Sequence, residues 1–534
     1  MLARPERPLA KTVAWAADHP RLLTLMLGGV AALGFPPLRL WPLALLAMGA
    51  FVLLLRRAGS TRAAFLLGWL FGVAHYTVTN NWIATAFTFQ AEMPAALGWV
   101  AVPLLSLYLG VYPGLAAAAA HRIGRNWPAA AFIILFGACW IVAEWLKSWV
   151  FTGYAWGPFS LAFLGGFDRP GLAAVLPVIG TYALSGLMVA ISGVFVLSLA
   201  ERRWRTALLV AALLTLGMFW PARPLAAPGA LPVTLVQPNL RQEDLNNPAK
   251  FEEQFVRIAR LSLPERPGTR RLVLWPESGV PDYLRDGYPQ RYYDQMTAGG
   301  DPRFARGRIG EVIGPGSLLL TGAVNLEIAE EDGYRRAVGA YNTVTALDAN
   351  GTIGATYNKA HLVPYGEYLA LRWLLEPLGA TRLVAGALDF IPGPGPRTLE
   401  LGSWGEAGVQ ICYEIIFSGK VVDPANRPDY LFNPSNDGWF GAWGPPQHLA
   451  QARMRAIEEG LPVLRSTTTG ISAIVSADGV VRHHIASGKA ARVDTTIPPA
   501  AAPTLFSRIG HWLTLLWALA MVAASLVAMR RRPV

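Results

Sequence analysis

Eight long apolar runs constrain this 534-residue chain more than any other feature of its sequence. The longer runs reach the roughly 20 residues that an α-helix needs to cross a bilayer. Composition agrees, because 53% of the residues are apolar and only 15% are charged, against about 25% in an ordinary soluble protein. We therefore expect an α-helical transmembrane bundle of about eight spans, the first two joined as a tight hairpin or kinked unit by Phe35-Pro36-Pro37. Their approximate bounds are 21–34, 40–55, 63–79, 95–120, 128–150, 171–200, 206–221 and 509–529.

The basic residues predict how the chain crosses the membrane. Cytoplasmic loops carry an excess of Lys and Arg, and with eight spans all five basic clusters fall on one side. We therefore expect both termini in the cytoplasm and the segments 80–94, 151–170 and 222–508 on the outer side. This placement also accounts for the net charge of +11 without nucleic acid as a partner. The clusters are Arg4, Arg7 and Lys11; Arg56, Arg57 and Arg62; His121, Arg122 and Arg125; Arg202, Arg203 and Arg205; and Arg530, Arg531 and Arg532.

The composition becomes that of a globular domain between about 222 and 508. Short β-rich runs alternate there with helical patterns, notably at 249–262 and 447–459. Runs such as VTLVQ and LVLW have no polar face, so we expect helices to cover these strands on both sides. The sequence predicts an α/β sandwich of residues 222–507, between a membrane domain of residues 1–221 and a last helix with a basic tail, residues 508–534.

Three polar residues directly follow buried strands of this domain. Glu277 ends LVLWPE, Lys359 follows ATYN, and Cys412 follows GVQI. In α/β folds, sites assemble in the loops beyond the carboxyl ends of strands. A carboxylate that takes the thiol proton, a thiolate nucleophile and an ammonium beside the developing oxyanion are sufficient for acyl transfer. The alternative interpretation is a packed cysteine and a structural Glu–Lys ion pair, and spacing alone does not choose between the two.

Longer motifs carry a resemblance to known families. WPES, YNKAHLVPYGEY, ICYE and SNDGWF, in this order, resemble the nitrilase superfamily. The extended forms, together with GFPPLRLWPLALLA and EWLKSWVFTGYAWGPF in the membrane half, resemble the apolipoprotein N-acyltransferase family over nearly the whole chain. The resemblance implies a nitrilase-like α-β-β-α sandwich on a bacterial inner membrane, with the catalytic domain in the periplasm.

The resemblance also assigns roles to individual residues. By motif, Glu277 is the general base, Lys359 the oxyanion stabiliser and Cys412 the nucleophile. The backbone N–H of Tyr413 is expected to share the oxyanion with Lys359. In one stretch, residues 237–247, the Trp that the acyltransferase family often carries is missing. The residues expected to support the site are Glu367, Tyr413 and Glu414.

Other polar residues receive more than one interpretation. Asn436, Asp437 and Trp439 border the pocket or only form a Gly-rich turn. His361 and His448 have no partners at metal-ligand spacing, so we expect hydrogen-bonded structural histidines, no metal and no cofactor.

Two further features lie close to the membrane. Glu144 and Lys147 are interpreted as interfacial anchors, in preference to a role in lipid gating. The apolar segment 368–375 is either a lid that dips into the bilayer or part of the core. Cys139 lies in an apolar run and is expected to be packing.

The expected reaction is the transfer of a fatty acyl group from a membrane glycerophospholipid, through a Cys412 thioester, to the α-amine of a diacylglyceryl-cysteine apolipoprotein. The expected partners are thus the phospholipid donor, the diacylated apolipoprotein and membrane lipid, and the protein is expected to act as a monomer. One alternative is a membrane-anchored amidase that hydrolyses small carbon–nitrogen substrates with the same triad. A second is a scaffold or transporter, which the intact triad disfavours.

Overall fold

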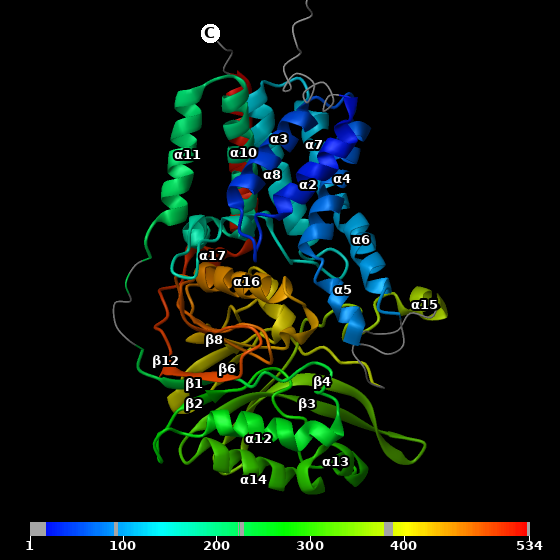
Figure 1. Ribbon diagram of the computed structural model, residues 1–534, viewed down its shortest axis with the longest axis vertical. Coiled ribbons are helices and arrows are strands. Elements are labelled where there is room, and N and C mark those ends of the chain that lie inside the picture. Colours follow the sequence, from blue (N-terminus) through cyan, green and yellow to red (C-terminus); the bar gives the residue numbers. More distant parts are fainter. Residues whose placement is uncertain (1–17, 90–93, 223, 225–228, 379–387, 531–534) are drawn as a thin grey trace, which may run out of the picture.

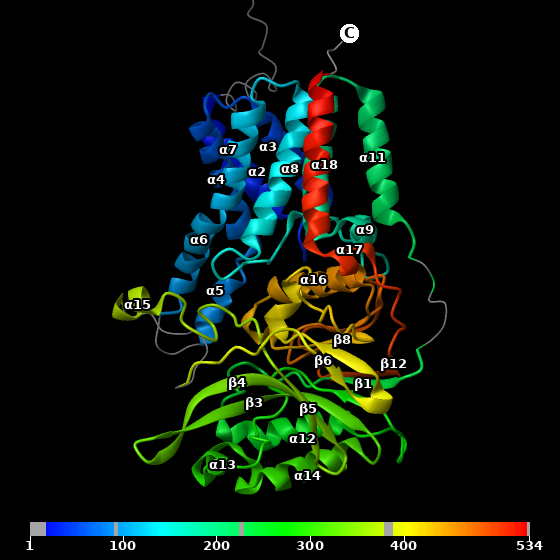
Figure 2. The same cartoon turned by 180° about the vertical axis from the view of Figure 1, so that it is seen from behind.

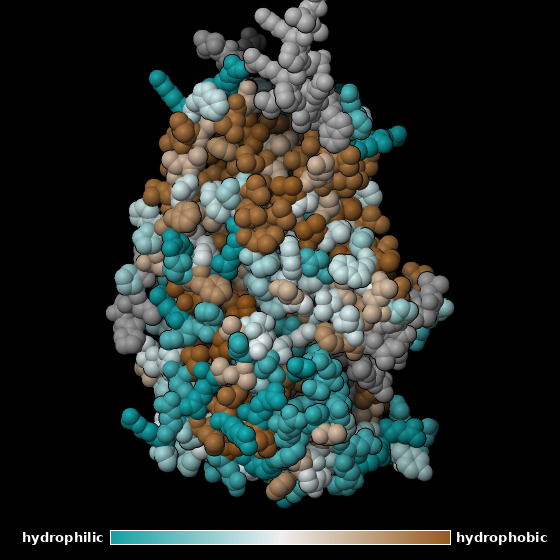
Figure 3. Space-filling view, in the orientation of Figure 1, coloured by the Kyte–Doolittle hydropathy of each residue, from teal (hydrophilic) through white to brown (hydrophobic). Residues whose placement is uncertain are grey.

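The structure is a computed structural model that describes residues 18–89, 94–222, 224, 229–378 and 388–530. It consists of a helical bundle and an α/β sandwich stacked along the long axis of the molecule (Figure 1). Apolar side chains cover the bundle half of the face shown in Figure 3, and polar side chains predominate over the sandwich. An apolar belt of this kind is the surface that a bilayer covers.

A helix forms at each of the eight predicted apolar runs. Among the described residues, four helices are long and apolar enough to cross a membrane: the continuous Leu97–Gly124, Ala129–Lys147, Thr181–Ala200 and His511–Arg530. Pro20–Ala32, Trp41–Arg56 and Trp204–Phe219 are shorter apolar helices. The bundle comprises α2 (Pro20–Ala32), α3 (Trp41–Arg56), α4 (Thr61–Thr79), α6 (Leu97–Leu109), α7 (Val111–Gly124), α8 (Ala129–Lys147), α10 (Thr181–Ala200), α11 (Trp204–Phe219) and α18 (His511–Arg530).

Two of the basic clusters lie together. His121 contacts the Thr61 hydroxyl at 3.3 Å and the Ala58 carbonyl at 2.9 Å, so the α3–α4 turn lies beside the end of α7. In Figures 1 and 2 these helix ends, and the α10–α11 turn, lie at the end of the bundle away from the sandwich. The clusters at residues 4–11 and 531–532 lie outside the described residues.

Two six-stranded mixed sheets form the sandwich. The first has the order β12 (Ala491–Thr496), β1 (Pro232–Gln237), β2 (Leu272–Leu274), β3 (Leu318–Glu331), β4 (Tyr334–Asp348) and β5 (Ile353–Asn358). The second has the order β11 (Val481–Ile485), β10 (Ser472–Val475), β9 (Val463–Thr467), β8 (Tyr430–Ser435), β7 (Glu406–Val409) and β6 (Thr398–Glu400). The strands at the centre of each sheet, β1–β2–β3 and β7–β8–β9, are parallel.

Each sheet is covered by helices on one face and by the other sheet on its second face. In β2, Leu272 and Leu274 belong to the core between the sheets, whereas Val273 belongs to the core under the outer helices. This alternation explains why the run has no polar face. The expectation of helices on both sides was therefore wrong, since the second apolar layer is a sheet. The outer helices are α12 (Phe251–Ser262), α13 (Gln290–Met296) and α14 (Pro302–Ile313) on the first sheet, and α16 (Gly444–Glu459) on the second.

Helix α16 lies between the second sheet and the membrane bundle (Figure 2). Fifteen of its sixteen residues are buried, including charged ones, because both of its faces are covered. The Glu458 carboxylate accepts a hydrogen bond from the Thr181 backbone N–H at the start of α10, at 2.7 Å. Gln447 donates to the carbonyls of Pro36 and Thr79, at 3.1 Å each. This helix therefore fixes the sandwich to the bundle.

Candidate active site

The predicted triad comes from both sheets. Glu277 follows β2 and Lys359 follows β5, both in the first sheet, whereas Cys412 follows β7 in the second and opens the short helix η8 (Cys412–Ile416). Their exposed fractions are 7%, 1% and 5%. The structure thus brings the three buried residues close together, where the charges of Glu277 and Lys359 act on the Cys412 thiol.

Lys359 lies between two carboxylates. Its Nζ is 2.9 Å from Glu367 Oε1 and 3.6 Å from Glu277 Oε1. Burial alone would lower the pKa of Lys359, but the charges of Glu367 and Glu277 outweigh it and raise this pKa above its usual value. Lys359 is therefore a permanent cation that is suited to stabilising an oxyanion.

Asn342, which the sequence analysis did not single out, links the two carboxylates. Its Nδ2 donates to Glu277 Oε1 at 2.7 Å and to Glu367 Oε1 at 3.0 Å. The other oxygen of Glu277 accepts from the backbone N–H of Asn436 at 2.8 Å. Both oxygens of the expected base are thereby held in place, and Asn436 reaches the site through its backbone.

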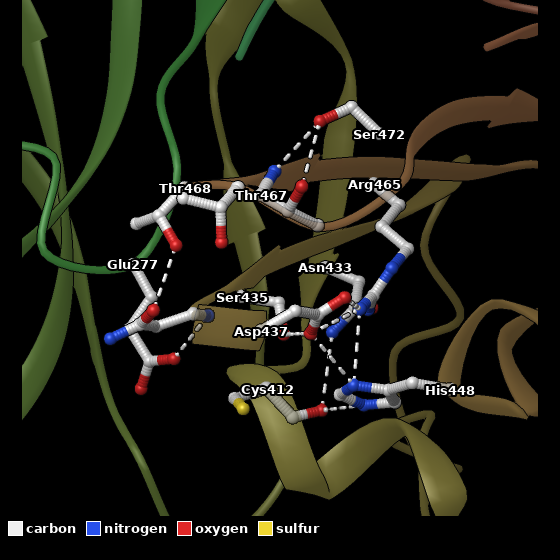
Figure 4. A network of polar contacts seen from close by, with 12 residues as sticks. Glu277, Cys412, Asn433, Ser435, Asp437, His448, Arg465, Thr467, Thr468 and Ser472 are labelled. Carbon is white, nitrogen blue, oxygen red and sulfur yellow. Dashed lines mark hydrogen bonds and ion pairs between the residues drawn. The ribbon is translucent and has the colours of Figure 1, made fainter. Parts of the chain in front are cut away.

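The nucleophile turn has an unusual backbone. Cys412 has φ +50°, in the left-handed region that costs an L-residue roughly 1–2 kcal/mol. Its side chain points toward Glu277 in Figure 4, and its carbonyl points the other way, toward His448. Burial raises the pKa of the Cys412 thiol and the charge of Glu277 adds to this, while Lys359 opposes it. The resting thiol is therefore neutral and requires a base.

Glu414 links the nucleophile turn to the loop that carries Lys359. Its carboxylate accepts hydrogen bonds from the Tyr357 hydroxyl (2.8 Å) and from the backbone N–H groups of Ala360 (2.7 Å), His361 (3.0 Å) and Ile411 (2.7 Å). Burial raises its pKa from 4.5 to about 7, against the effect of these hydrogen bonds. Glu414 thus joins the Lys359 loop to the nucleophile turn rather than facing the thiol.

The two histidines have different surroundings. His448 is fully buried and its Nε2 is hydrogen-bonded to the Cys412 carbonyl, while its Nδ1 faces Arg465 and Asp437, so the expectation of a hydrogen-bonded structural histidine is met. The His361 ring packs 3.9 Å from the Phe417 ring, and burial lowers its pKa to about 4. Among the described residues, no group of three or more His, Cys, Asp or Glu is arranged to hold a metal ion.

Aromatic packing holds the side chains of Tyr413, a predicted support residue, and Trp439, a predicted border residue. The Tyr413 ring lies edge-on to Phe417 at 5.2 Å, and Trp439 packs edge-on against Phe89 at 5.9 Å. In the stretch that lacks the family's Trp, Gln242 accepts a hydrogen bond from Asn436 Nδ2 at 2.7 Å. Gln242 therefore supports the same loop that fixes Glu277.

Glu144 and Lys147 do not lie exposed at an interface. Their exposed fractions are 4% and 2%, and Lys147 Nζ donates to the carbonyls of Tyr154 and Trp156 at 2.9 and 3.1 Å. The interpretation as interfacial anchors was wrong, because the chain after α8 folds back over the helix end: the 154–156 loop covers Lys147, and the Phe159 N–H donates to Glu144 at 2.8 Å.

The apolar segment after the Lys359 loop divides in two. Leu369 and Ala370 are buried, whereas Leu371, Trp373 and Leu374 are exposed, Trp373 by 76%. Helix α15 (Arg372–Leu375) projects sideways at the level where the bundle meets the sandwich (Figures 1 and 2). Core packing therefore holds only for the first two of these residues.

Comparison with known proteins follows the same division of the chain. The model of the apolipoprotein N-acyltransferase N-terminal domain matches residues 27–194, and that of carbon-nitrogen hydrolase matches residues 233–487. The chain is 33% identical to the apolipoprotein N-acyltransferases of Rhodopseudomonas palustris and of Bradyrhizobium diazoefficiens, over 96% of this chain and 95% of each relative. An amidase structure from Nesterenkonia sp. is 18% identical, with 52% of this chain and 93% of the amidase covered and a TM-score of 0.31.

Proposed function

This chain belongs to the apolipoprotein N-acyltransferase family, and from that premise we propose that Cys412 is its nucleophile, with Glu277 as the base and Lys359 as the oxyanion stabiliser. The activity is the N-acylation of apolipoproteins. The observation that carries the proposed roles is the buried arrangement of a neutral thiol facing a carboxylate that is held by Asn342 and Asn436.

In the first half-reaction, Glu277 removes the thiol proton and Cys412 Sγ attacks the ester carbonyl of a membrane glycerophospholipid. The S–C bond forms, the ester C–O bond breaks, and Glu277 returns the proton to the departing alkoxide of the lysophospholipid. Lys359 and the backbone N–H of Tyr413 stabilise the oxyanion. The products are a Cys412 thioester and a lysophospholipid.

In the second half-reaction, the α-amine of the diacylglyceryl-cysteine attacks the thioester. The N–C bond forms, the S–C bond breaks, and the amine proton passes through Glu277 to the Cys412 thiolate. An α-amine, with a pKa of about 7.7–8.0, is partly neutral near pH 7, whereas a lysine amine, at about 10.4, is nearly all protonated. Amine basicity thus favours the N-terminus over lysine side chains as the acceptor.

The placement of the enzyme in the cell is part of the proposal. We place the end of the bundle that carries the basic clusters in the cytoplasm of a bacterial inner membrane, because Lys and Arg are retained there. Eight crossings then put both termini in the cytoplasm and the catalytic domain, residues 222–507, in the periplasm. A monomer is sufficient, because one chain supplies the whole triad.

Intact mass spectrometry tests the first half-reaction. Full-length protein incubated with phospholipid and no acceptor is expected to gain one fatty acyl group that hydroxylamine removes. Cys412→Ala should lack this adduct, Glu277→Gln should form it far more slowly than wild type, and Cys139→Ala, the matched control at the second cysteine, should keep it. Addition of a diacylglyceryl-cysteine peptide should then discharge the thioester and acylate the peptide's α-amine.

The same experiment exposes the alternative. A wild type that forms no lipid adduct but releases ammonia from small amides would be a membrane-anchored amidase with water as its acceptor. That outcome would overturn the proposed acyl transfer through Cys412.

A further inference from the structure

A second polar network lies on the side of the nucleophile turn away from Glu277. His448 Nε2 lies 3.0 Å from the Cys412 carbonyl oxygen, and Asn433 Nδ2 lies 3.4 Å from it. A carbonyl only accepts hydrogen bonds, so Nε2 is the protonated nitrogen of the imidazole. In Figure 4 this contact and the thiol lie on opposite sides of the Cys412 backbone.

The imidazole itself is fixed from all directions. Its Nδ1 lies 3.0 Å from Arg465 Nη2, which only donates, and 3.1 Å from Asp437 Oδ1. Arg465 Nη2 lies 2.7 Å from each oxygen of Asp437, and the Ser435 hydroxyl donates to Asp437 Oδ1 at 2.9 Å. His448, Arg465 and Ser435 are fully buried, and Asp437 is 2% exposed.

Aromatic side chains also hold the ring. Trp156, from the membrane half of the chain, lies 5.2 Å from the His448 ring, and Phe440 lies 5.6 Å from it. Burial and the charge of Arg465 lower the pKa of His448, which agrees with a neutral imidazole whose one hydrogen is on Nε2.

The planarity of the peptide bond gives this contact a consequence for catalysis. In a trans peptide the carbonyl of one residue and the N–H of the next are rigidly coupled and point in opposite directions. The hydrogen bond to the Cys412 carbonyl therefore fixes the direction of the Tyr413 N–H, which points away from His448 and toward the side of the thiol. This N–H is the oxyanion donor in the mechanism above.

We propose that His448, oriented by Asp437 and Arg465, is a positioning residue that holds the Cys412–Tyr413 peptide plane so that the Tyr413 N–H meets the oxyanion. His448 touches neither the substrate nor the thiol, and it acts through the peptide plane alone. The inference rests on the proposed role of Cys412 as the nucleophile. It adds His448 as the residue that orients the Tyr413 N–H toward the oxyanion.

Two substitutions separate hydrogen bonding from packing. His448→Phe keeps the ring between Trp156 and Phe440 but removes the N–H, whereas His448→Gln loses the ring and keeps an amide N–H near the position of Nε2. Thioester formation from phospholipid is expected to slow by about 10- to 100-fold in His448→Phe, below the range for losing an oxyanion donor outright, because the Asn433 contact remains. The concentration of lipid for half-maximal rate should stay unchanged, and His448→Gln should recover most of the rate.

A second reaction of the same thiol distinguishes the positioning role from a merely structural one, because general damage to the site would slow this reaction as well. Iodoacetamide alkylates Cys412 by direct displacement and forms no oxyanion, so in a Cys139→Ala background its rate should be the same in wild type and His448→Phe. The proposal would be overturned if His448→Phe lost alkylation and acylation in parallel, or if it formed the thioester as fast as wild type. It would also be overturned if His448→Gln were as impaired or as unfolded as His448→Phe. Failure of the wild type to form any thioester would instead overturn the proposed function.

Discussion

The ammonium of Lys359 donates a hydrogen bond to Glu367 at 2.9 Å, and both side chains are buried. With Glu277 they form a cluster of two carboxylates and one cation. Transfer of the Cys412 proton to Glu277 leaves the total charge of this site unchanged, because a thiolate replaces a carboxylate beside the same cation. Glu277 can therefore act as the base, and Lys359 as the oxyanion stabiliser, without a change in the net charge of the buried site.

The two carboxylates are expected to contribute unequally to the rate. Glu277→Gln removes the proton acceptor, and thioester formation should fall by about 10²- to 10⁴-fold. Glu367→Gln keeps the base and an oxygen that accepts from Lys359. Its loss in the rate of thioester formation should therefore be smaller than that of Glu277→Gln by a factor of about ten or more. Single-turnover mass spectrometry of acyl-enzyme measures both rates, and equal losses would contradict the assignment of Glu277 as the base.

Asn342 is expected to matter for stability as well as for activity. Asn342→Leu removes one of the buried hydrogen bonds that each of the Glu277 and Glu367 carboxylates accepts, and a hydrogen bond to a charged group contributes about 1.5–3 kcal/mol. Its thermal unfolding temperature in detergent should therefore fall clearly below that of wild type. Asn350→Leu, at an exposed turn, is the matched control and should change little; equal shifts would argue against the role of Asn342.

Glu414 predicts a pH dependence of stability. Its folded pKa of about 7 exceeds its ordinary 4.5, so the folded protein binds this proton more tightly than the unfolded chain does. The stabilisation is fully present below pH 4.5 and is lost as the pH rises toward 7, by up to about 1.4 kcal/mol per pH unit in that window. The test is to measure the unfolding temperatures of wild type and Glu414→Gln from pH 4.5 to 8. As the pH rises toward 7, this stabilisation should be lost from wild type and not from the variant, so the two proteins should show different slopes of unfolding temperature against pH. Identical slopes would place the carboxylate's folded pKa near 4.5.

The attachment of α16 to the bundle is expected to stabilise the whole molecule. Glu458→Ala removes the acceptor of the Thr181 N–H at the start of α10, and it leaves Arg455, the partner of Glu458 within α16 (Nε to Oε2, 2.7 Å), as an unpaired buried charge. Loss of one partner of a buried pair costs about 3–5 kcal/mol.

A surface pair provides the control for this prediction. Glu252→Ala breaks a contact of 2.6 Å to Arg308, but the Glu252 side chain is 66% exposed, and such pairs contribute about 0–1 kcal/mol. Thermal unfolding of the two variants in detergent should therefore differ widely. Similar small shifts would show that stability does not depend on the buried contacts of Glu458 with Arg455 and Thr181.

Much of the fold follows from local patterns. The apolar runs predict the helices of the bundle because a helix in lipid must be apolar along its length. Runs such as 271–277 and 429–435 predict β2 and β8 because strands buried on both faces lack polar positions. Weaker patterns did not predict β6, β11, β12 or α14, because these elements have exposed or mixed positions.

By itself, the sequence determined which residue types are available for chemistry and that Glu277, Lys359 and Cys412 each follow a strand. Only the tertiary structure decided that they meet, because the strands belong to two sheets and their contacts are set by packing at a distance. It also decided the roles of Asn342 and His448, neither of which stands in a motif that predicts a partner. The burial of α16 has the same cause: its charged residues suggest an exposed face, and only the bundle, folded from the other end of the chain, covers that face and supplies the partners that make burial tolerable.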